Sequence, residues 1–181
     1  MGLSIDFFDR DVLVVAKALI GVSFKIEGVG GLIVETEAYR NDDAASHSFR
    51  GKTLHNSVMF GPPAHAYVYR SYGLHWCFNM TCGHGNGVLL RAIEPLFGLE
   101  KMIERRQVSS QKLLCSGPGR LTQSLGIVGV MNGLQLINPP FELTRGSTVA
   151  IVIGKRVGIT RAPENPWRFG MKGSAFHSQK F

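Results

Sequence analysis

Two glutamates and a tyrosine at alternate positions of an otherwise apolar segment are the side chains best placed to do chemistry. Successive side chains of a β-strand point to opposite faces, so Glu35, Glu37 and Tyr39 share one face of a strand over residues 31–39. A packed core does not accept two carboxylates beside a phenol unless their charge is compensated or used. This face therefore either meets water or lines a site.

Two interpretations of this carboxylate pair stay open from the residues alone. A carboxylate near apolar groups has its pKa raised towards the range of general acid–base catalysis, and a like charge beside it raises one of the pair further. The alternative is two solvated glutamates on an edge strand. Tyr39 favours a site, because a flat ring beside a carboxylate can hold a planar substrate against a base.

The chain is basic and carries clustered aromatic residues. Its formal net charge is +7 and its pI is about 9.6, which attracts phosphates, anionic lipid head groups or acidic substrates. Rings on a basic surface stack on unpaired bases, and a side chain at a turn such as Tyr72-Gly73 can wedge between base pairs. The alternative is a set of ordinary core aromatics. The rings concerned are Tyr39, Tyr67, Tyr69, Tyr72 and Trp76.

Other common chemistries find little support in the sequence. The six histidines show no close pairing with a Glu of the kind that marks a zinc helix, and the three cysteines form no C-x-x-C pair, so we expect no metal site and no disulfide framework. The run 83–87 lacks the Gly-Lys-Ser/Thr ending of a phosphate loop. Lys52, the lysine nearest the acidic strand, has no desolvating neighbours that would make it a nucleophile, so a water activated by a carboxylate is the simpler hypothesis.

The positioning elements follow from periodicity and turn residues. A length of 181 residues without repeats or linkers predicts a single domain over 1–181. No apolar run approaches the roughly 18 residues of a membrane span, and the N-terminus lacks the order of a secretory signal, so we expect an intracellular protein with no membrane contact.

Helices are expected over 9–20 with Asp9 as N-cap, over 99–106 and over 118–125. Strands are expected over 22–26, 31–39, 64–70, 75–80, 88–93, 148–153 and 156–160, with a long loop over 40–63. The sum is an α+β fold, mainly antiparallel sheet with peripheral helices.

An ordered set of short motifs carries a resemblance to a known family. The motifs are Glu35-Thr36-Glu37-Ala38-Tyr39, Met59-Phe60-Gly61-Pro62-Pro63, Tyr67-Val68-Tyr69, Tyr72-Gly73, Cys77-Phe78-Asn79, Leu89-Leu90-Arg91-Ala92-Ile93-Glu94-Pro95, Cys115-Ser116-Gly117-Pro118, Arg156-Val157-Gly158-Ile159 and Arg168-Phe169. In this order they resemble the alkyladenine (3-methyladenine) DNA glycosylase family, and the compact length is similar to that of bacterial members. The resemblance extends from about residue 6 to about residue 176.

The resemblance implies a compact domain built on a curved antiparallel sheet. It implies a monofunctional DNA glycosylase that flips alkylated or deaminated purines out of duplex DNA and hydrolyses the N-glycosidic bond in base excision repair. By family position, Glu37 is the general base that activates water, and Arg91 and the backbone carbonyl of Val157 position that water. Arg91 is expected to lower the pKa of Glu37 and keep it ionised.

The same resemblance implies roles for the residues that meet DNA. Tyr39, His47 and Tyr69 correspond to the pocket around the flipped base, and Asn79 to a side chain that excludes normal guanine. Tyr72 corresponds to the residue inserted into the duplex, and Arg106 to a phosphate contact. No cofactor or metal is implied, and the partner is double-stranded DNA containing damaged purines. We expect a monomer in the bacterial cytoplasm, held at the nucleoid through DNA.

Two positions depart from the family pattern, and two rival functions stay open. His75 and Gly170 stand where relatives carry aromatic residues, which leaves the DNA contact beside Tyr72 and one wall of the pocket open. The first rival is a catalytically silent module that binds nucleic acid through the same aromatic and basic face. The second is a glycosylase that also cuts the backbone through a lysine.

Overall fold

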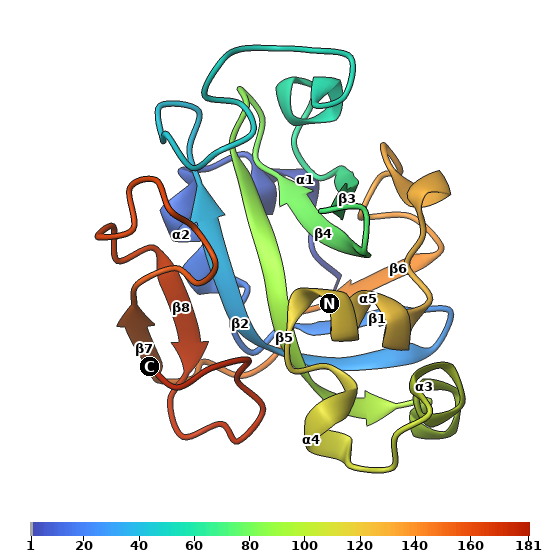
Figure 1. Ribbon diagram of the computed structural model, residues 1–181. Helices are drawn as coiled ribbons and strands as arrows, with labels where there is room; N and C mark the ends of the chain where they lie inside the picture. Colours follow the sequence, from blue (N-terminus) through green and yellow to red (C-terminus); the bar gives the residue numbers. More distant parts are fainter. Residues whose placement is uncertain (1) are drawn as a thin grey trace.

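The protein, described over residues 2–181 by a computed structural model, is built on one curved sheet in which all pairings are antiparallel (Figure 1). The strand order is β3-β4-β5-β2-β1-β6, with β8 pairing to both β2 and β7. The strands are β1 (Ser23–Ile26), β2 (Val29–Tyr39), β3 (Ala66–Ser71), β4 (His75–Thr81), β5 (Gly87–Phe97), β6 (Phe141–Thr144), β7 (Ile151–Gly154) and β8 (Arg168–Met171).

Short helices lie around this sheet, and the predicted α+β fold is confirmed. The α-helices are α1 (Ile5–Phe8), α2 (Val12–Ala18), α3 (Leu99–Arg106), α4 (Gln111–Leu114) and α5 (Pro118–Leu125), and the 3₁₀ turns are η1 (Ser57–Phe60) and η2 (Gly129–Met131). Helix α2 packs on β2, where the Thr36 hydroxyl donates to the carbonyl of Ala16 at 2.9 Å. Helix α5 packs on β4 and β5, and the Thr122 hydroxyl donates to the carbonyl of Trp76 at 2.9 Å.

The long strands β2 and β5 form the centre of the sheet and carry the acidic residues. The carboxyl-terminal half of β2 pairs with β5 on one side and with β8 on the other, so that Glu37 lies opposite Leu89 and Arg168. The β2–β5 register shifts on both sides of Glu35, an irregularity of the kind that bends a strand. Glu35 and Glu37 therefore occupy a central strand. The interpretation of two solvated glutamates on an edge strand is wrong, because both residues are fully buried.

The helix predicted over residues 9–20 begins later than expected, so the assignment of Asp9 as its N-cap is wrong. The chain forms two helices there, and the N-cap of α2 is Asp11 rather than Asp9. The Asp11 carboxylate accepts hydrogen bonds from the backbone N–H groups of Leu13 and Val14 at 2.9 and 3.3 Å. Asp9 instead ends α1, where its N–H donates to the carbonyl of Ile5.

The predicted strand over residues 156–160 is also wrong. This segment is a loop, because Val157 donates its N–H to a glutamate side chain and Gly158 takes a positive φ of 72°. The sequence interpretation also missed β6 and β8. Strand β8 is only four residues long, and it pairs with β7 and with β2, which lies more than a hundred residues earlier, so local sequence patterns do not reveal it.

One hydrophobic cluster runs through the fold from Leu3 to Phe169 and includes the fully buried Phe8, Phe24 and Phe78. It holds the sheet against α1, α2 and α5. Among residues 2–181, no helix is long and apolar enough to cross a membrane.

Candidate active site

Glu37 is a fully buried carboxylate held by two hydrogen bonds and one ion pair. Its Oε1 accepts the backbone N–H of Val157 at 2.7 Å and lies 3.4 Å from Nη1 of Arg91, while its Oε2 accepts the hydroxyl of Tyr39 at 2.8 Å. The contact from Val157 is its N–H, whereas the family resemblance emphasised its carbonyl. Strand β2 positions Glu37 and Tyr39 on one face, as the alternation predicts, and β5 brings Arg91 to them.

Glu35 is the second buried carboxylate, and it is shared by two arginines. Its Oε1 lies 3.4 Å from Nε of Arg91 and 3.1 Å from Nε of Arg168. The backbone N–H and hydroxyl of Ser178 donate to its two oxygens at 2.5 and 2.9 Å. Glu35 is thus a counterion for two guanidinium groups, and Ser178 is a partner that the sequence interpretation missed.

Burial governs the charge of Glu37. Removal from water raises the pKa of Glu37 above its usual value of 4.5, and this outweighs the lowering by the Arg91 charge and by the hydrogen bonds from Val157 and Tyr39. The expectation that Arg91 keeps the pKa of Glu37 low is therefore wrong in its net direction. Arg91 acts in the predicted sense, but the loss of hydration is the larger effect.

An open cavity of about 610 Å³ lies beside the residues that contact Glu37. The three residues that contact the carboxylate, Tyr39, Arg91 and Val157, all line it. This volume falls in the range typical of small-molecule sites. Its other lining side chains include His47, Met59, Tyr67, Tyr69, Cys77, Asn79 and Leu89. The fold thus gathers four predicted base-binding residues, Tyr39, His47, Tyr69 and Asn79, around one hollow.

His47 and two tyrosines of β3 form an aromatic wall of the cavity. The His47 ring lies 4.4 Å from that of Tyr69 between centroids, and its Nδ1 is 2.9 Å from the hydroxyl of Tyr67. Tyr67 and Tyr69 are 5.4 Å apart, which agrees with the predicted alternation of β3. Burial lowers the pKa of His47, which favours a neutral ring near pH 7. The Tyr67 contact occupies Nδ1 and leaves Nε2 for a ligand.

Asn79 lies on β4 with its side chain in the cavity wall. It is buried, and its Nδ2 donates to the carbonyl of Tyr67 at 3.1 Å. This hydrogen bond fixes the amide group against β3, so that a polar group stands at a defined place among the rings.

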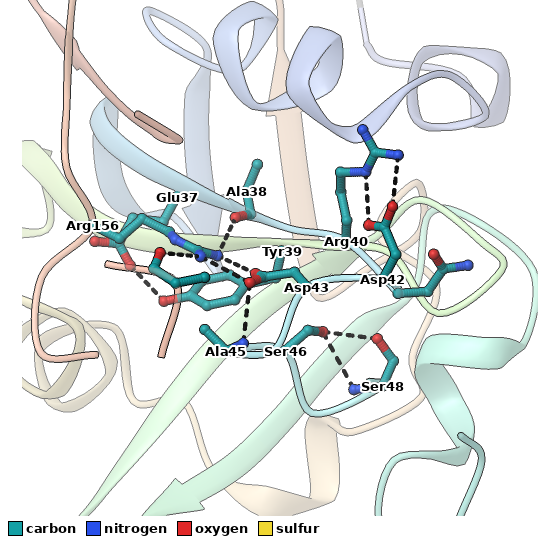
Figure 2. Close-up of polar contacts among 12 residues, drawn as sticks. Glu37, Ala38, Tyr39, Arg40, Asp42, Asp43, Ala45, Ser46, Ser48 and Arg156 are labelled. Atoms are coloured by element: carbon teal, nitrogen blue, oxygen red, sulfur yellow. Dashed lines mark hydrogen bonds and ion pairs between the residues drawn. The ribbon is translucent and has the colours of Figure 1, made fainter. Parts of the chain in front are cut away.

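A buried ion pair ties two loops to the site (Figure 2). Arg156 pairs with Asp43, and its guanidinium also donates to the carbonyl of Ala38 at 3.1 Å and stacks 4.6 Å from the Tyr39 ring centroid. Asp43 belongs to the loop that carries His47, and Arg156 directly precedes Val157. Neither Asp43 nor this role of Arg156 was found from the sequence, because their partners lie more than a hundred residues apart.

The mouth of the cavity carries an exposed tyrosine and two arginines. Tyr72 sits at the β3–β4 turn with 88% of its surface exposed and a positive φ of 51°. Arg70 and Arg161 also line the cavity and are exposed, and the sequence interpretation did not single them out. These cations suit an anionic ligand that enters from this side.

Arg106 does not line the cavity. It lies at the end of α3, half-buried, with Nη1 donating to Gln123 at 2.5 Å and Nη2 to the carbonyl of Leu113 at 3.4 Å. Burial lowers its pKa. A phosphate contact by Arg106 stays a prediction, and it would have to compete with these internal partners.

The two positions that depart from the family pattern have defined surroundings. His75 lines the cavity and lies against α5, where a Cβ on Gly119 would come within 2.7 Å of its ring. Gly170 lies in β8 beneath the ring of Phe181. Within residues 2–181, no cluster of three or more His, Cys, Asp or Glu side chains could hold a metal ion.

The curved antiparallel sheet carries a cavity lined by aromatic side chains, and the buried Glu37 carboxylate contacts three residues of its wall, an arrangement typical of an enzyme active site. A family model described as methylpurine-DNA glycosylase matches residues 6–175. The chain belongs to the methylpurine-DNA glycosylase family, as the motifs indicated, and is a hydrolase of N-glycosyl bonds in DNA repair.

Bacterial relatives align along nearly the whole chain. Proteins named "Putative 3-methyladenine DNA glycosylase" from Rhizobium meliloti (strain 1021) and Nitrosospira multiformis are 58% and 56% identical over 178 and 182 residues. These alignments cover 98% of this chain in both cases, and 96% and 94% of the two relatives. A protein of the same name from Agrobacterium fabrum is 57% identical over 176 residues, which cover 97% of this chain and 91% of the relative.

Proposed function

We propose that this enzyme flips a damaged purine out of duplex DNA into the aromatic cavity and hydrolyses its N-glycosidic bond with a water that Glu37 activates. The observation that carries this proposal is the placement of Glu37, fully buried yet in contact with three residues that line the cavity. The names of the bacterial relatives support 3-methyladenine as one substrate.

The water step follows from the acceptor positions of the carboxylate. An ionised carboxylate offers about four of them, the hydrogen bonds from Val157 and Tyr39 occupy one on each oxygen, and Arg91 lies beside Oε1 as an ion pair. One position on Oε2 is left to take a proton from water. The water oxygen then bonds to C1′ of the sugar, the C1′–N bond breaks, and its electron pair leaves with the base. The carbonyl of Val157 and the Arg91 guanidinium hold this water in place.

The carboxylate serves the reaction in a second way. The sugar becomes cation-like as the glycosidic bond breaks, and a buried anion stabilises this charge more strongly than a solvated one does. A methylated purine such as 3-methyladenine is already cationic and leaves easily. A deaminated purine such as hypoxanthine is neutral and requires a proton or a hydrogen bond at N7.

The cavity wall accounts for selection of the base. The flipped base lies between Tyr39 and the His47–Tyr69 pair, with Nε2 of His47 at its edge. Asn79 stands where the 2-amino group of normal guanine would collide with it. Damaged purines are also extruded at a lower cost than paired ones, which adds selectivity.

Duplex DNA approaches the mouth of the cavity. Tyr72 fills the gap that the flipped nucleotide leaves, Arg70 and Arg161 meet phosphates beside it, and Arg106 is a more distant phosphate contact. The enzyme acts as a monomer and needs no cofactor. Like the bacterial relatives, it is expected to work in the cytoplasm, at the nucleoid.

The two rival functions lack a supporting observation. A silent binding module has no need of a buried Glu37 behind its binding surface or of a buried Arg91 in the cavity wall, since buried charges are costly. A lysine nucleophile would have to reach the cavity, and none of the described residues that line it is a lysine.

Single-turnover assays on duplexes with one hypoxanthine or one ethenoadenine, and on methylated DNA, test this function. We expect release of the free base, with a strand that stays intact until alkali is added and no covalent adduct after borohydride. A trapped adduct would favour the lysine route. Retained DNA binding without release of any base would favour the silent module.

A further inference from the structure

The segment over residues 172–181, which follows β8, contacts the buried charged residues of the active site through Ser178. Ser178 donates its N–H and hydroxyl to the two oxygens of Glu35 at 2.5 and 2.9 Å. Its hydroxyl oxygen accepts from both Nε and Nη2 of Arg91 at 3.2 Å. One hydroxyl group therefore joins the buried carboxylate of Glu35 to the arginine that faces Glu37.

The residues on both sides of Ser178 are anchored, so the serine is held in place. Arg168 donates to the carbonyls of Gln179 and Lys180 at 2.9 Å each, and its guanidinium lies 3.8 Å from the ring centroid of Phe181. That ring covers Gly170, where a Cβ would come within 2.4 Å of it. The absence of a side chain at Gly170 thus makes room for Phe181.

The contacts of Ser178 determine which nitrogen of Arg91 faces Glu37. Ser178 occupies Nε and Nη2, and the remaining Nη1 points to Oε1 of Glu37 at 3.4 Å. Glu35 attracts the same guanidinium and lies 3.4 Å from its Nε. Without the serine hydroxyl, the Arg91 fork can turn towards Glu35, because a planar guanidinium prefers to bind a carboxylate through two nitrogens.

We propose that Ser178 is a positioning residue that fixes the rotation of the Arg91 guanidinium, so that Nη1 faces Glu37 while Nε stays beside Glu35. This inference rests on the proposed function, because it assigns Arg91 its task in that reaction. The segment over residues 172–181, which follows β8, then contributes a residue to the catalytic centre that the long strands β2 and β5 do not supply. A misplacement of about 1 Å at a reacting group can cost about a hundredfold in rate, so a fixed orientation matters.

The test compares three variants in the full chain. Ser178→Ala removes the hydroxyl, and Ser178→Thr keeps it. Ser174→Ala is the matched control, because Ser174 lies in the same segment and its hydroxyl accepts only the N–H of Phe176 among the contacts found in residues 2–181. Single-turnover base release, the Kd for lesion duplex, the Tm and the pH profile of release are measured for each.

We expect Ser178→Ala to release base about tenfold or more slowly, with an unchanged Kd, while Ser178→Thr recovers most of the rate and Ser174→Ala matches the wild type. The acidic limb of the pH profile should move to higher pH in Ser178→Ala, because the Arg91 charge lowers the pKa of Glu37. Other charged or titratable groups around Glu37 stay in place in this variant. They are Glu35 and Tyr39 on β2, Tyr69 on β3, Cys77 on β4 and Arg168 on β8.

The outcomes separate this inference from the proposed function. If the wild type releases base and Ser178→Ala has the same rate and pH profile, the positioning role is wrong. Equal losses in Ser178→Ala and Ser174→Ala, with a lower Tm in both, also overturn it, since they indicate general loosening of the segment. If the wild type itself releases no base, the proposed function fails first.

Discussion

Glu37 lies in a buried environment that disfavours its ionised form. Burial raises its pKa, and the donors from Val157, Arg91 and Tyr39 offset only part of that effect. Burial makes Glu37 a stronger base than a solvated carboxylate, and the same burial strengthens its attraction to the positive charge that develops on the sugar. The residue that serves catalysis is therefore expected to reduce stability.

We predict that Glu37→Gln is more stable than the wild type at neutral pH. The folded-state pKa of Glu37 is raised, so its contribution favours folding below the unfolded-state value and is lost as pH rises through the folded-state pKa. Gln keeps an acceptor for Val157 and carries no charge. Thermal unfolding from about pH 8 down to about pH 4 should show a higher Tm for the variant at pH 7, where 1 kcal/mol corresponds to about 2–4 °C for a chain of this size.

The difference should shrink as pH falls, because Glu37 then becomes neutral in the wild type as well. A lower Tm for Glu37→Gln at neutral pH would contradict the account, since it would mean that the ion pair with Arg91 outweighs the cost of burial.

At the scale of elements, two loops form the wall of the cavity, and one ion pair joins them. Arg156 and Asp43 have fully buried side chains, and their bond connects the loop that holds His47 to the loop that holds Val157. Removing one partner of a buried pair costs about 3–5 kcal/mol, because the other charge is left uncompensated.

We therefore expect Asp43→Asn to lower the free energy of unfolding by about 3–5 kcal/mol and to slow base release. The neighbouring Asp42→Asn is the matched control, because its pair with Arg40 is exposed and contributes at most about 1 kcal/mol (Figure 2). Urea unfolding of both variants checks this. Similar effects of the two substitutions would show that the buried pair does not hold the loops together.

The β3–β4 turn carries the second prediction at this scale. Tyr72 is almost fully exposed at a turn closed by the N–H of Leu74 to the carbonyl of Ser71 at 3.0 Å, so it contributes little to the core. We expect Tyr72→Ala to weaken binding of lesion duplex about tenfold or more, since stacking on a base contributes about 1–3 kcal/mol, with little change in Tm. Release from single strands should change less.

Binding and base release by Tyr72→Ala and Tyr72→Phe, on duplex and single-stranded substrates, measure this effect. Equal losses on both substrates would count against insertion into the duplex.

Contacts within one strand could be predicted from the sequence, whereas contacts between distant parts of the chain could not. Alternation identified Glu37 with Tyr39 and Tyr67 with Tyr69, because each pair lies within one strand and side-chain direction there has a fixed period. Ser178, Asp43 and strand β8 were missed, because each meets the site through contacts more than a hundred residues apart along the chain. The expectation that the pKa of Glu37 is low was also wrong. That pKa depends on how deeply Glu37 is buried, which only the assembled fold determines.

At the scale of the whole molecule, charge is divided between the interior and the surface. The three buried arginines, Arg91, Arg156 and Arg168, balance the three buried acids, Glu35, Glu37 and Asp43. The net charge of +7 therefore belongs to the exposed and half-buried residues. A surface of this kind favours salt-sensitive affinity for DNA of any sequence, while the neutral interior holds the catalytic carboxylate in place.

The most direct test of the central claim is single-turnover base release from 3-methyladenine-containing duplex by the wild type, Glu37→Gln and the exposed control Glu100→Gln. We predict that Glu37→Gln binds the lesion duplex as tightly as the wild type and releases no base above background, while Glu100→Gln behaves as the wild type. Base release by Glu37→Gln at the wild-type rate would contradict the assignment of Glu37 as the group that activates water.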